Sequence, residues 1–531
     1  MDTETYKAAK MKVIFIAVIV FSAMLANFVL WSGFALGFFI TVLVGEIFIF
    51  TLLPFPKMRQ NVIASVFFGF STAALALTYL VYSEIMLMVL NFFVIVLLLL
   101  LQLLIHSEAL ESDWNTPKFA VEILISPFVR PFRFLPEFIN TAKTFRKPRD
   151  TSDDGITQTV RSHTGRNIFL GLLAALPVLA VVIALLSSAD IVFGNYFKSI
   201  IDFIRNLNIG EVVFTVILGA FIFPFLFSFV FSYVNKWKES SGSQLSVSVG
   251  PEVRKFGIEP VFASTFLFCV NIVYGLFTWV QFSSLFGALA HALPEDLTYA
   301  EYAREGFFQL AFVACINVVL VIVGVMATNR NGPAGVLVRV MSVLMIAFTY
   351  VLLVSAAYRM KMYISVFALT KLRLFVSIFM VLIAAVLLFA LIKEFFDKFK
   401  FFKFAFVSAV IILLVSNFLN PSYRIAEYNI QYHGGGDGSG SGYRLDTSYL
   451  VYDLSFDAVP VLLDHIDDYK YVDRTSIESG LVGVYGSYLK DYREGNWRKY
   501  NVSKERAKVL IEQYFGDDLA AELEYQGFAV E

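Results

Sequence analysis

The sequence predicts an all-α polytopic membrane protein of about eleven transmembrane helices, followed by a small, mostly helical soluble module at the C-terminus. Its composition is 58% hydrophobic and 16% charged, whereas soluble domains have roughly 45–50% apolar and about 25% charged residues. The apolar residues also fall into separate runs near the roughly 20 residues that a helix needs to cross a hydrocarbon core. The region after residue 442 is polar in character.

Eleven apolar runs have the length of a membrane span. A tight turn at Ser32 and Gly33 separates the first two, and a miscount there would reverse which side of the membrane each later loop faces. The runs are Val13–Trp31, Gly33–Leu53, Asn61–Tyr82, Ile85–Ile105, Asn167–Ser187, Val212–Tyr233, Glu259–Phe282, Gly306–Thr328, Ala334–Tyr358, Leu372–Phe395 and Phe401–Phe418.

The runs divide the chain into five segments. Residues 1–105 hold the first four spans, 106–166 a cytoplasmic interfacial loop, and 167–419 the main transmembrane domain of about seven helices. Residues 420–442 form a short helix and a Gly/Ser linker, and 443–531 an acidic helical soluble tail. Helical periodicity in the tail is expected over Ala458–Ile466, Ile477–Tyr492 and Ser503–Phe515.

Lysine and arginine in the short loops predict the orientation. Basic residues cluster before the first span and after the second, fourth, sixth, eighth and tenth, which places the N-terminus in the cytoplasm and the tail outside. One segment departs from this rule. The predicted external loop from Tyr358 to Arg373 also carries Arg359, Lys361 and Lys371.

Familiar catalytic motifs are missing from the sequence. It has no H-E-x-x-H, paired C-x-x-C, G-x-S-x-G or Walker loop, and its five histidines lack ligand spacing. We therefore expect no metal and no cofactor, and an enzymatic role is disfavoured without being excluded. The net charge of -1 gives no indication of a nucleic-acid partner. The lipid bilayer is the expected partner, and the sequence indicates no particular protein partner.

The predicted outer face carries the candidate binding residues. Basic residues held there against the insertion rule need compensation, either from carboxylates or from an anionic ligand. The two interpretations are an ion-pair network between helix ends and a pocket for an anionic lipid headgroup or another envelope component. In the second, Arg304, Arg359 and Arg373 bind the anion. The candidates are Asp190, Tyr299, Glu301, Tyr302, Arg304, Glu305, Arg359, Lys361, Tyr363, Lys371 and Arg373.

Within the spans, Glu46 is the intramembrane carboxylate to consider. Such a residue is a functional candidate by default, although tilting toward the cytoplasmic interface near Lys57 is the simpler and favoured explanation. Uncharged amides in the spans are expected to form hydrogen bonds between helices. They are Asn27, Asn91, Gln102, Asn271, Gln281 and Asn317.

Several ordered blocks resemble a bacterial multi-pass membrane family known only as a domain of unknown function, of the four-one-five-three or four-one-seven-three type. They include Ser187-Ser-Ala-Asp-Ile-Val-Phe, Tyr299-Ala-Glu-Tyr-Ala-Arg-Glu-Gly, Tyr358-Arg-Met-Lys-Met-Tyr and Asn420-Pro-Ser-Tyr-Arg-Ile-Ala-Glu-Tyr-Asn. The resemblance runs from about Asn167 to Leu463 and implies a bacterial cytoplasmic membrane, but it provides no catalytic residue. Ala368 stands where the family resemblance leads us to expect glycine, and Lys361 where we expect an apolar residue.

Three functions are compatible with these features. The first is a non-enzymatic sensor, assembly factor or scaffold with a charged outer-face site. The second is a transporter or flippase for an anionic or lipid-linked envelope substrate, and the nearly charge-free interior of the spans weighs against it. The third is an envelope transferase in which Asp190 or Glu301 is the general base.

Overall fold

A computed structural model of the chain describes residues 3–28, 34–53, 55–107, 131–138, 141, 195, 198, 210–234, 259–288, 307–327, 332–433, 445–468, 471–492 and 497–528. Within these ranges the regular secondary structure is entirely helical. The longer helices are α1 (Thr3–Asn27), α2 (Leu36–Leu52), α3 (Arg59–Val81), α4 (Ile85–His106), α8 (Gly210–Val234), α9 (Pro260–Ala288), α11 (Phe307–Ala327), α12 (Gly332–Phe367), α13 (Lys371–Phe395) and α14 (Phe401–Phe418).

Seven of the described helices are long and apolar enough to cross a membrane, namely α3, α4, α8, α9, α12, α13 and α14. Shorter apolar helices lie at residues 11–27, 36–52 and 309–324. The all-helical membrane class is therefore confirmed. The predicted run Asn167–Ser187 lies outside the described residues, so the total of eleven spans stays a prediction.

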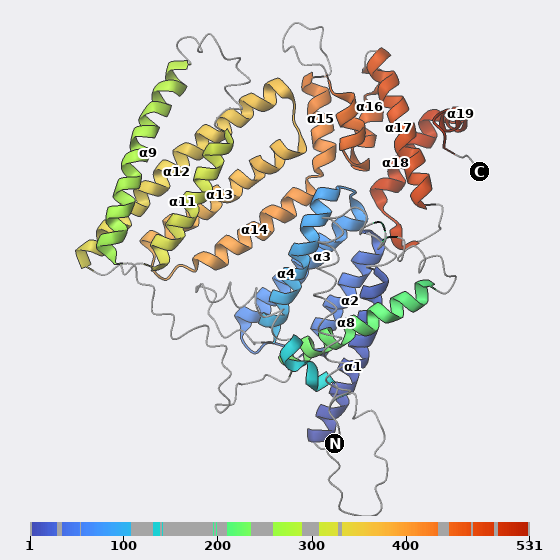
Figure 1. Ribbon diagram of the computed structural model, residues 1–531, viewed down its shortest axis with the longest axis horizontal. Helices are drawn as coiled ribbons and strands as arrows, with labels where there is room; N and C mark the ends of the chain where they lie inside the picture. The colour runs from blue at the N-terminus through green and yellow to red at the C-terminus, as the bar shows by residue number, and fades with distance from the viewer. Residues whose placement is uncertain are drawn as a thin grey trace, which may run out of the picture.

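The apolar helices form two packed groups that share α14 (Figure 1). The first group comprises α1, α2, α3, α4 and α8, and the second comprises α9, α11, α12 and α13. Val410 of α14 belongs to the core of the first group, whereas Phe401 at its other end belongs to the core of the second. α14 thus joins the two groups through apolar packing.

Large apolar side chains also cover the outer faces of these helices. On α9, Phe262, Val273, Leu276 and Trp279 are all exposed. A helix that is apolar on its inner and outer faces is typical of a protein surrounded by lipid. The exposed faces therefore agree with the membrane class that the composition predicts.

The structure corrects the loop predicted between Tyr358 and Arg373, because α12 continues to Phe367. No glycine or proline interrupts residues 358–367, and Met360 is buried in the core of the second group. The 36 residues of α12 span about 54 Å at 1.5 Å per residue, well beyond a core about 30 Å thick. Part of α12 can therefore extend past the lipid.

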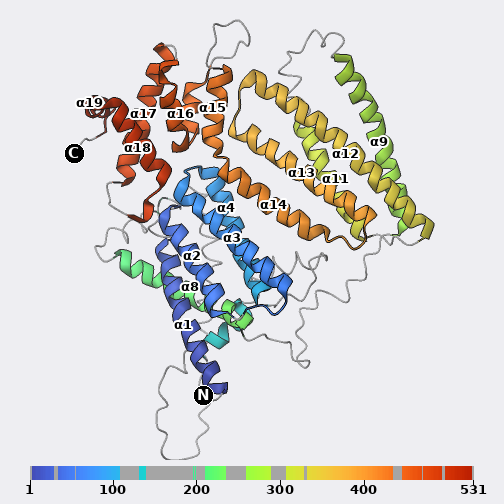
Figure 2. The ribbon, with the colours of Figure 1, turned by 180° about the vertical axis from the view of Figure 1, so that it is seen from behind.

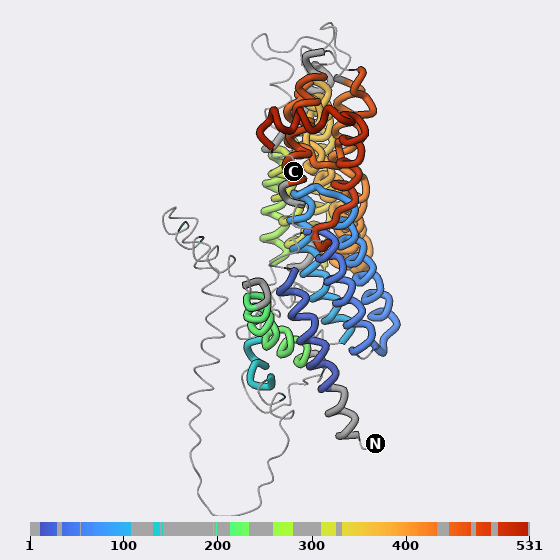
Figure 3. Tube along the Cα trace, turned by 90° about the vertical axis from the view of Figure 1, so that its right-hand side faces the viewer, coloured from blue at the N-terminus to red at the C-terminus, as the bar shows by residue number. Residues whose placement is uncertain are grey.

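The C-terminal helices pack together at one end of the molecule, opposite the N-terminus (Figures 2 and 3). We call α15 and residues 445–528 the C-terminal unit. It contains α15 (Pro421–His433), η2 (Tyr449–Asp453), η3 (Phe456–Ala458), α16 (Val459–Asp464), η4 (Ile466–Asp468), α17 (Tyr471–Tyr492), η5 (Trp497–Lys499), α18 (Val502–Phe515) and α19 (Asp518–Tyr525).

The C-terminal unit has its own hydrophobic core. Ile425 and Ile430 of α15 pack with Leu450, Leu481 and other residues from after the linker. The three predicted helical stretches of the tail correspond to α16, α17 and α18. The short helix before the linker thus shares a core with the helices after it.

Candidate functional site at the helix ends

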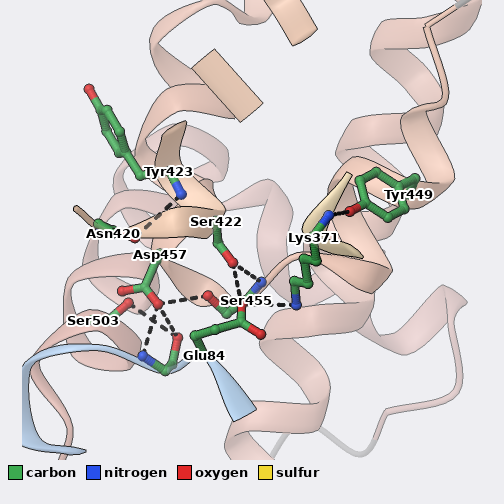
Figure 4. Close-up of polar contacts among 10 residues, drawn as sticks. Glu84, Lys371, Asn420, Ser422, Tyr423, Tyr449, Ser455, Asp457 and Ser503 are labelled. Carbon is green, nitrogen blue, oxygen red and sulfur yellow. Dashed lines mark hydrogen bonds and ion pairs between the residues drawn. The ribbon is translucent and has the colours of Figure 1, made fainter. Parts of the chain in front are cut away.

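Polar residues gather where the turn between α3 and α4 meets the start of α13 and the C-terminal unit (Figure 4). The side chain of Glu84, from that turn, is 3% exposed, and its Oε2 lies 2.9 Å from the Lys371 Nζ. The hydroxyl of Ser422, in α15, donates a second hydrogen bond to the same oxygen at 2.5 Å. One buried carboxylate therefore connects three separate parts of the chain.

Asp457 is a second buried carboxylate, supplied by η3, and is 5% exposed. Its Oδ2 accepts hydrogen bonds from the backbone N–H of Ser83 at 2.8 Å and from the Ser83 hydroxyl at 3.0 Å. The Ser455 hydroxyl donates to the same oxygen at 2.7 Å. Hydrogen bonds to a charged group are each worth about 1.5–3 kcal/mol, so this carboxylate holds the C-terminal unit to the α3–α4 turn.

Asn501 joins a helix of the C-terminal unit to a helix of the first group. Its Oδ1 accepts from the Lys504 N–H at 3.0 Å and so caps the start of α18. Its amide Nδ2 donates to the carbonyls of Tyr79 and Tyr82 at 2.9 and 2.7 Å, at the end of α3. The last carbonyls of a helix lack partners within the helix, and here the C-terminal unit satisfies two of them.

The turn between α12 and α13 is held in a similar way. Asn429 of α15 accepts from the Leu369 N–H at 2.7 Å and donates to the Leu369 carbonyl at 2.9 Å. The Lys371 N–H donates to the Tyr449 hydroxyl at 2.8 Å. Burial is the main reason why the pKa of Tyr449 is raised. The C-terminal unit is thus docked on the ends of several apolar helices.

A cavity of about 550 Å³ lies between the C-terminal unit and these helix ends. Volumes of about 300–1,000 Å³ are typical of small-molecule sites. Its charged lining residues are Lys371, Lys499 and Lys504 against Asp453. Because the Lys371 ammonium is already paired with Glu84, Lys499 and Lys504 against Asp453 give the lining its positive balance. Its apolar lining includes Phe34, Ile85, Met88 and Val89 from the helix ends and Leu450, Val451, Leu454, Val459 and Leu462 from the C-terminal unit.

Of the predicted site residues, the structure brings Lys371 into this network. Arg373 points elsewhere: its guanidinium donates to the carbonyls of Phe367 and Ala368 and lies 4.1 Å from the ring centre of Tyr363. It therefore covers the carbonyl end of α12. Arg359 is buried at 8% exposure, and Lys361 is exposed, both on α12.

The remaining outer-face candidates lie outside the described residues, so their part in the site stays a prediction. They are Asp190, Tyr299, Glu301, Tyr302, Arg304 and Glu305. The carboxylate that pairs with Lys371 is Glu84, which the sequence analysis did not single out. The sequence contained one weak indication of Glu84: Ser83 and Glu84 are polar residues in the short turn between two apolar runs.

Amide side chains connect neighbouring helices, as predicted for Asn91, Gln102, Asn271 and Asn317. Asn91 of α4 donates to the Asn417 Oδ1 of α14 at 2.6 Å. Asn317 of α11 donates to the Thr349 hydroxyl of α12 at 3.0 Å. Asn271 donates to the Met341 carbonyl at 2.9 Å, and Gln102 to Glu46 at 2.7 Å.

Fold and site together define an integral membrane protein whose apolar helices are capped at one end by its own C-terminal helices. A family model described as Domain of unknown function (DUF4153) matches residues 69–465, about three quarters of the chain. The chain belongs to this family. A comparison of the chain with curated proteins found no match, and neither did a comparison with solved structures.

Proposed function

We propose that this protein is a non-enzymatic membrane sensor or scaffold that binds the anionic headgroup of a membrane lipid in the cavity below its C-terminal unit. The observation that carries the proposal is the cavity lining, which combines three lysines with apolar side chains from the end of a membrane-spanning helix. These are the two kinds of surface that an anionic amphiphile needs.

The charged part of the lining suits a phosphate. Lysine binds phosphate as a point charge, and basic residues near a membrane surface each contribute about 1 kcal/mol of attraction to anionic lipid. Lys371 comes from the start of α13, whereas Lys499 and Lys504 come from the C-terminal unit. Lys371 is paired with Glu84, so Lys499 and Lys504 would supply the charge for the headgroup, which would lie against the Lys371–Glu84 pair of the helix ends and so contact both parts of the protein.

The apolar part of the lining suits acyl chains. Ile85 and Val89 lie on α4, which is long and apolar enough to cross a membrane, and they are 73% and 47% exposed. Both residues also line the cavity. A lipid could therefore place its headgroup in the cavity while its chains stay against the outer face of α4.

A sensing or scaffolding role follows from where this ligand would lie. Binding would strengthen the docking of the C-terminal unit on the helix ends, because the ligand contacts both. We further propose that this face is the extracytoplasmic side of a bacterial cytoplasmic membrane, with the N-terminus in the cytoplasm. The basic loops of the sequence support that orientation.

The proposal is tested with purified full-length protein in nanodiscs of zwitterionic lipid, with and without added phosphatidylglycerol. We expect the anionic lipid to raise the melting temperature, and the double variant Lys499→Gln/Lys504→Gln to lose most of that rise. Arg506→Gln is the matched control, because Arg506 is exposed on the same α18 and does not line the cavity. An equal rise in the double variant and the control would contradict the proposal.

A transporter or flippase remains the second candidate, and the buried Glu46 of α2 is the observation that favours it. Reconstituted liposomes with a reporter of lipid scrambling or anion flux test this function. Flux that requires Glu46 would favour the transporter over the sensor. The absence of any flux of lipid-linked or small anionic probes across these bilayers would rule out the transporter function.

A further inference from the structure

A buried polar pair lies inside the first helix group, away from the cavity. Glu46 of α2 and Gln102 of α4 are 6% and 0% exposed. The Gln102 Nε2 donates to the Glu46 Oε2 at 2.7 Å. α3 passes close to both side chains, because a Cβ built on Gly69 would lie 2.8 Å from the Gln102 Nε2 and 2.8 Å from the Glu46 Oε2.

The pair is incomplete as a hydrogen-bonded unit. The Glu46 Oε1 and the Gln102 Oε1 are both fully buried and have no hydrogen-bond partner among the described residues. The Gln102 Oε1 is always an acceptor, and the Glu46 Oε1 is an acceptor only when the carboxyl group is ionised. Buried acceptors without a donor are uncommon and costly, and an ionised carboxylate here would add a buried charge to them.

We propose that Glu46 and Gln102 form an intramembrane proton-binding site in which Glu46 is the neutral acid at physiological pH. A proton on the Glu46 Oε1 turns that acceptor into a donor and removes the buried charge. Gly69 of α3 lies so close to the pair that little room is left beside it. This crowding favours a proton, the smallest cation, as the ligand. This inference is independent of the lipid cavity and of the sensor function.

The described contacts around the pair bring in aromatic rings and one histidine. α4 places His106 one turn beyond Gln102, where the imidazole Nδ1 lies 2.9 Å from the Ser65 hydroxyl of α3. α2 itself contributes Phe50, whose ring packs edge-on against the His106 ring with centroids 5.6 Å apart. α1 packs the Phe21 ring against Gly45. Of these contacting side chains, His106 is the titratable one.

Glu46 lies six residues before the end of α2, at Leu52, which is about 9 Å at 1.5 Å per residue. Gln102 and His106 occupy the last turn and a half of α4. Glu46 thus lies within a short distance of the helix ends, where a proton could enter, and His106 in the last turn of α4 is a group there that can bind one. This geometry fits a group that exchanges protons with one side of the membrane.

Infrared difference spectroscopy of the full-length protein in liposomes tests the site through the C=O band of a protonated carboxyl group. At about pH 7, we expect a band that disappears in Glu46→Gln. It should persist in Glu427→Gln, which makes the same chemical change at a partly exposed carboxylate paired with Arg424. Gln102→Leu should keep the band and move it to higher frequency, because the carbonyl oxygen loses its hydrogen-bond donor.

Three results would overturn the proposal. The first is the absence of any band that differs between the wild type and Glu46→Gln. The second is a band already lost by about pH 6, as for a carboxyl group in water with its pKa of about 4.3. The third is a band that appears only when sodium is replaced by a bulky organic cation, which would make the site a sodium site. Should Glu46→Gln fail to fold, the shift in Gln102→Leu still decides.

Discussion

Replacing Asp457 by asparagine tests whether the C-terminal unit is held down by this carboxylate. The change keeps the shape of the side chain and an acceptor oxygen but removes the negative charge. Three donors converge on the Asp457 Oδ2, two from Ser83 and one from Ser455. The substitution therefore weakens three hydrogen bonds without creating a cavity.

The expected magnitude follows from the number of donors. A hydrogen bond to a charged group is worth about 1.5–3 kcal/mol and one between neutral groups about 0.5–1.5 kcal/mol. The Ser455 bond lies within the C-terminal unit and is kept on undocking, so only the two bonds from Ser83 count. A loss of about 1 kcal/mol for each of these two gives about 2 kcal/mol of docking free energy for Asp457→Asn. At about 1.4 kcal/mol per factor of ten, the undocked population of the C-terminal unit should rise about 30-fold.

Hydrogen exchange measured by mass spectrometry reports that population directly. If these amides exchange when the C-terminal unit undocks, those in α16 and α18 should exchange about 30-fold faster in Asp457→Asn than in the wild-type protein. Asp464→Asn is the control, because Asp464 is an exposed carboxylate at the end of α16 that does not line the cavity, and its replacement should cost no more than about 0.5 kcal/mol. The reasoning is refuted if both variants exchange at the same rate in these helices.

Three further predictions concern stability. Glu84→Gln should cost about 3–5 kcal/mol, because it leaves the Lys371 ammonium without its buried partner; the double variant with Lys371→Met should recover part of this loss in chemical unfolding. Ala368→Gly should stabilise the protein by about 1 kcal/mol, because Ala368 has a φ of 66° and this region is unfavourable for residues with a Cβ; an unchanged or lower melting temperature would contradict it. Burial, with the hydrogen bond to Glu512, raises the pKa of Tyr485. Since the unfolded chain ionises this group near pH 10, stability should fall as the pH rises above about 10, and Tyr485→Phe should flatten that fall in thermal unfolding.

Glu84 and Asp457 show where sequence-based prediction of the site stopped. Neither residue belongs to a catalytic motif, and each pairs with groups hundreds of residues away in the chain. The unusual basic segment did point to Lys371, whose need for a compensating partner was predicted. The identity of that partner depends on which helix ends lie side by side, and no local pattern determines this.

The family resemblance gave one local prediction with a physical basis. Glycine was expected where Ala368 stands, and the positive φ at this residue agrees with that expectation. The neighbouring loop prediction was wrong, because charged residues at 359 and 361 were taken as a helix boundary. In the structure they lie on α12, which continues beyond the length needed to cross the lipid.

The sequence by itself determined that this is a helical membrane protein and predicted helices in its polar C-terminal tail, because hydropathy, run length and periodicity are properties of short segments. Tertiary structure alone decided that the C-terminal helices cap the ends of the apolar ones and enclose a cavity with them. It also decided that Glu46 is buried against Gln102 and not turned toward the membrane surface. Such pairings depend on the packing of whole helices, where burial makes each unpaired polar group costly and so selects its partner.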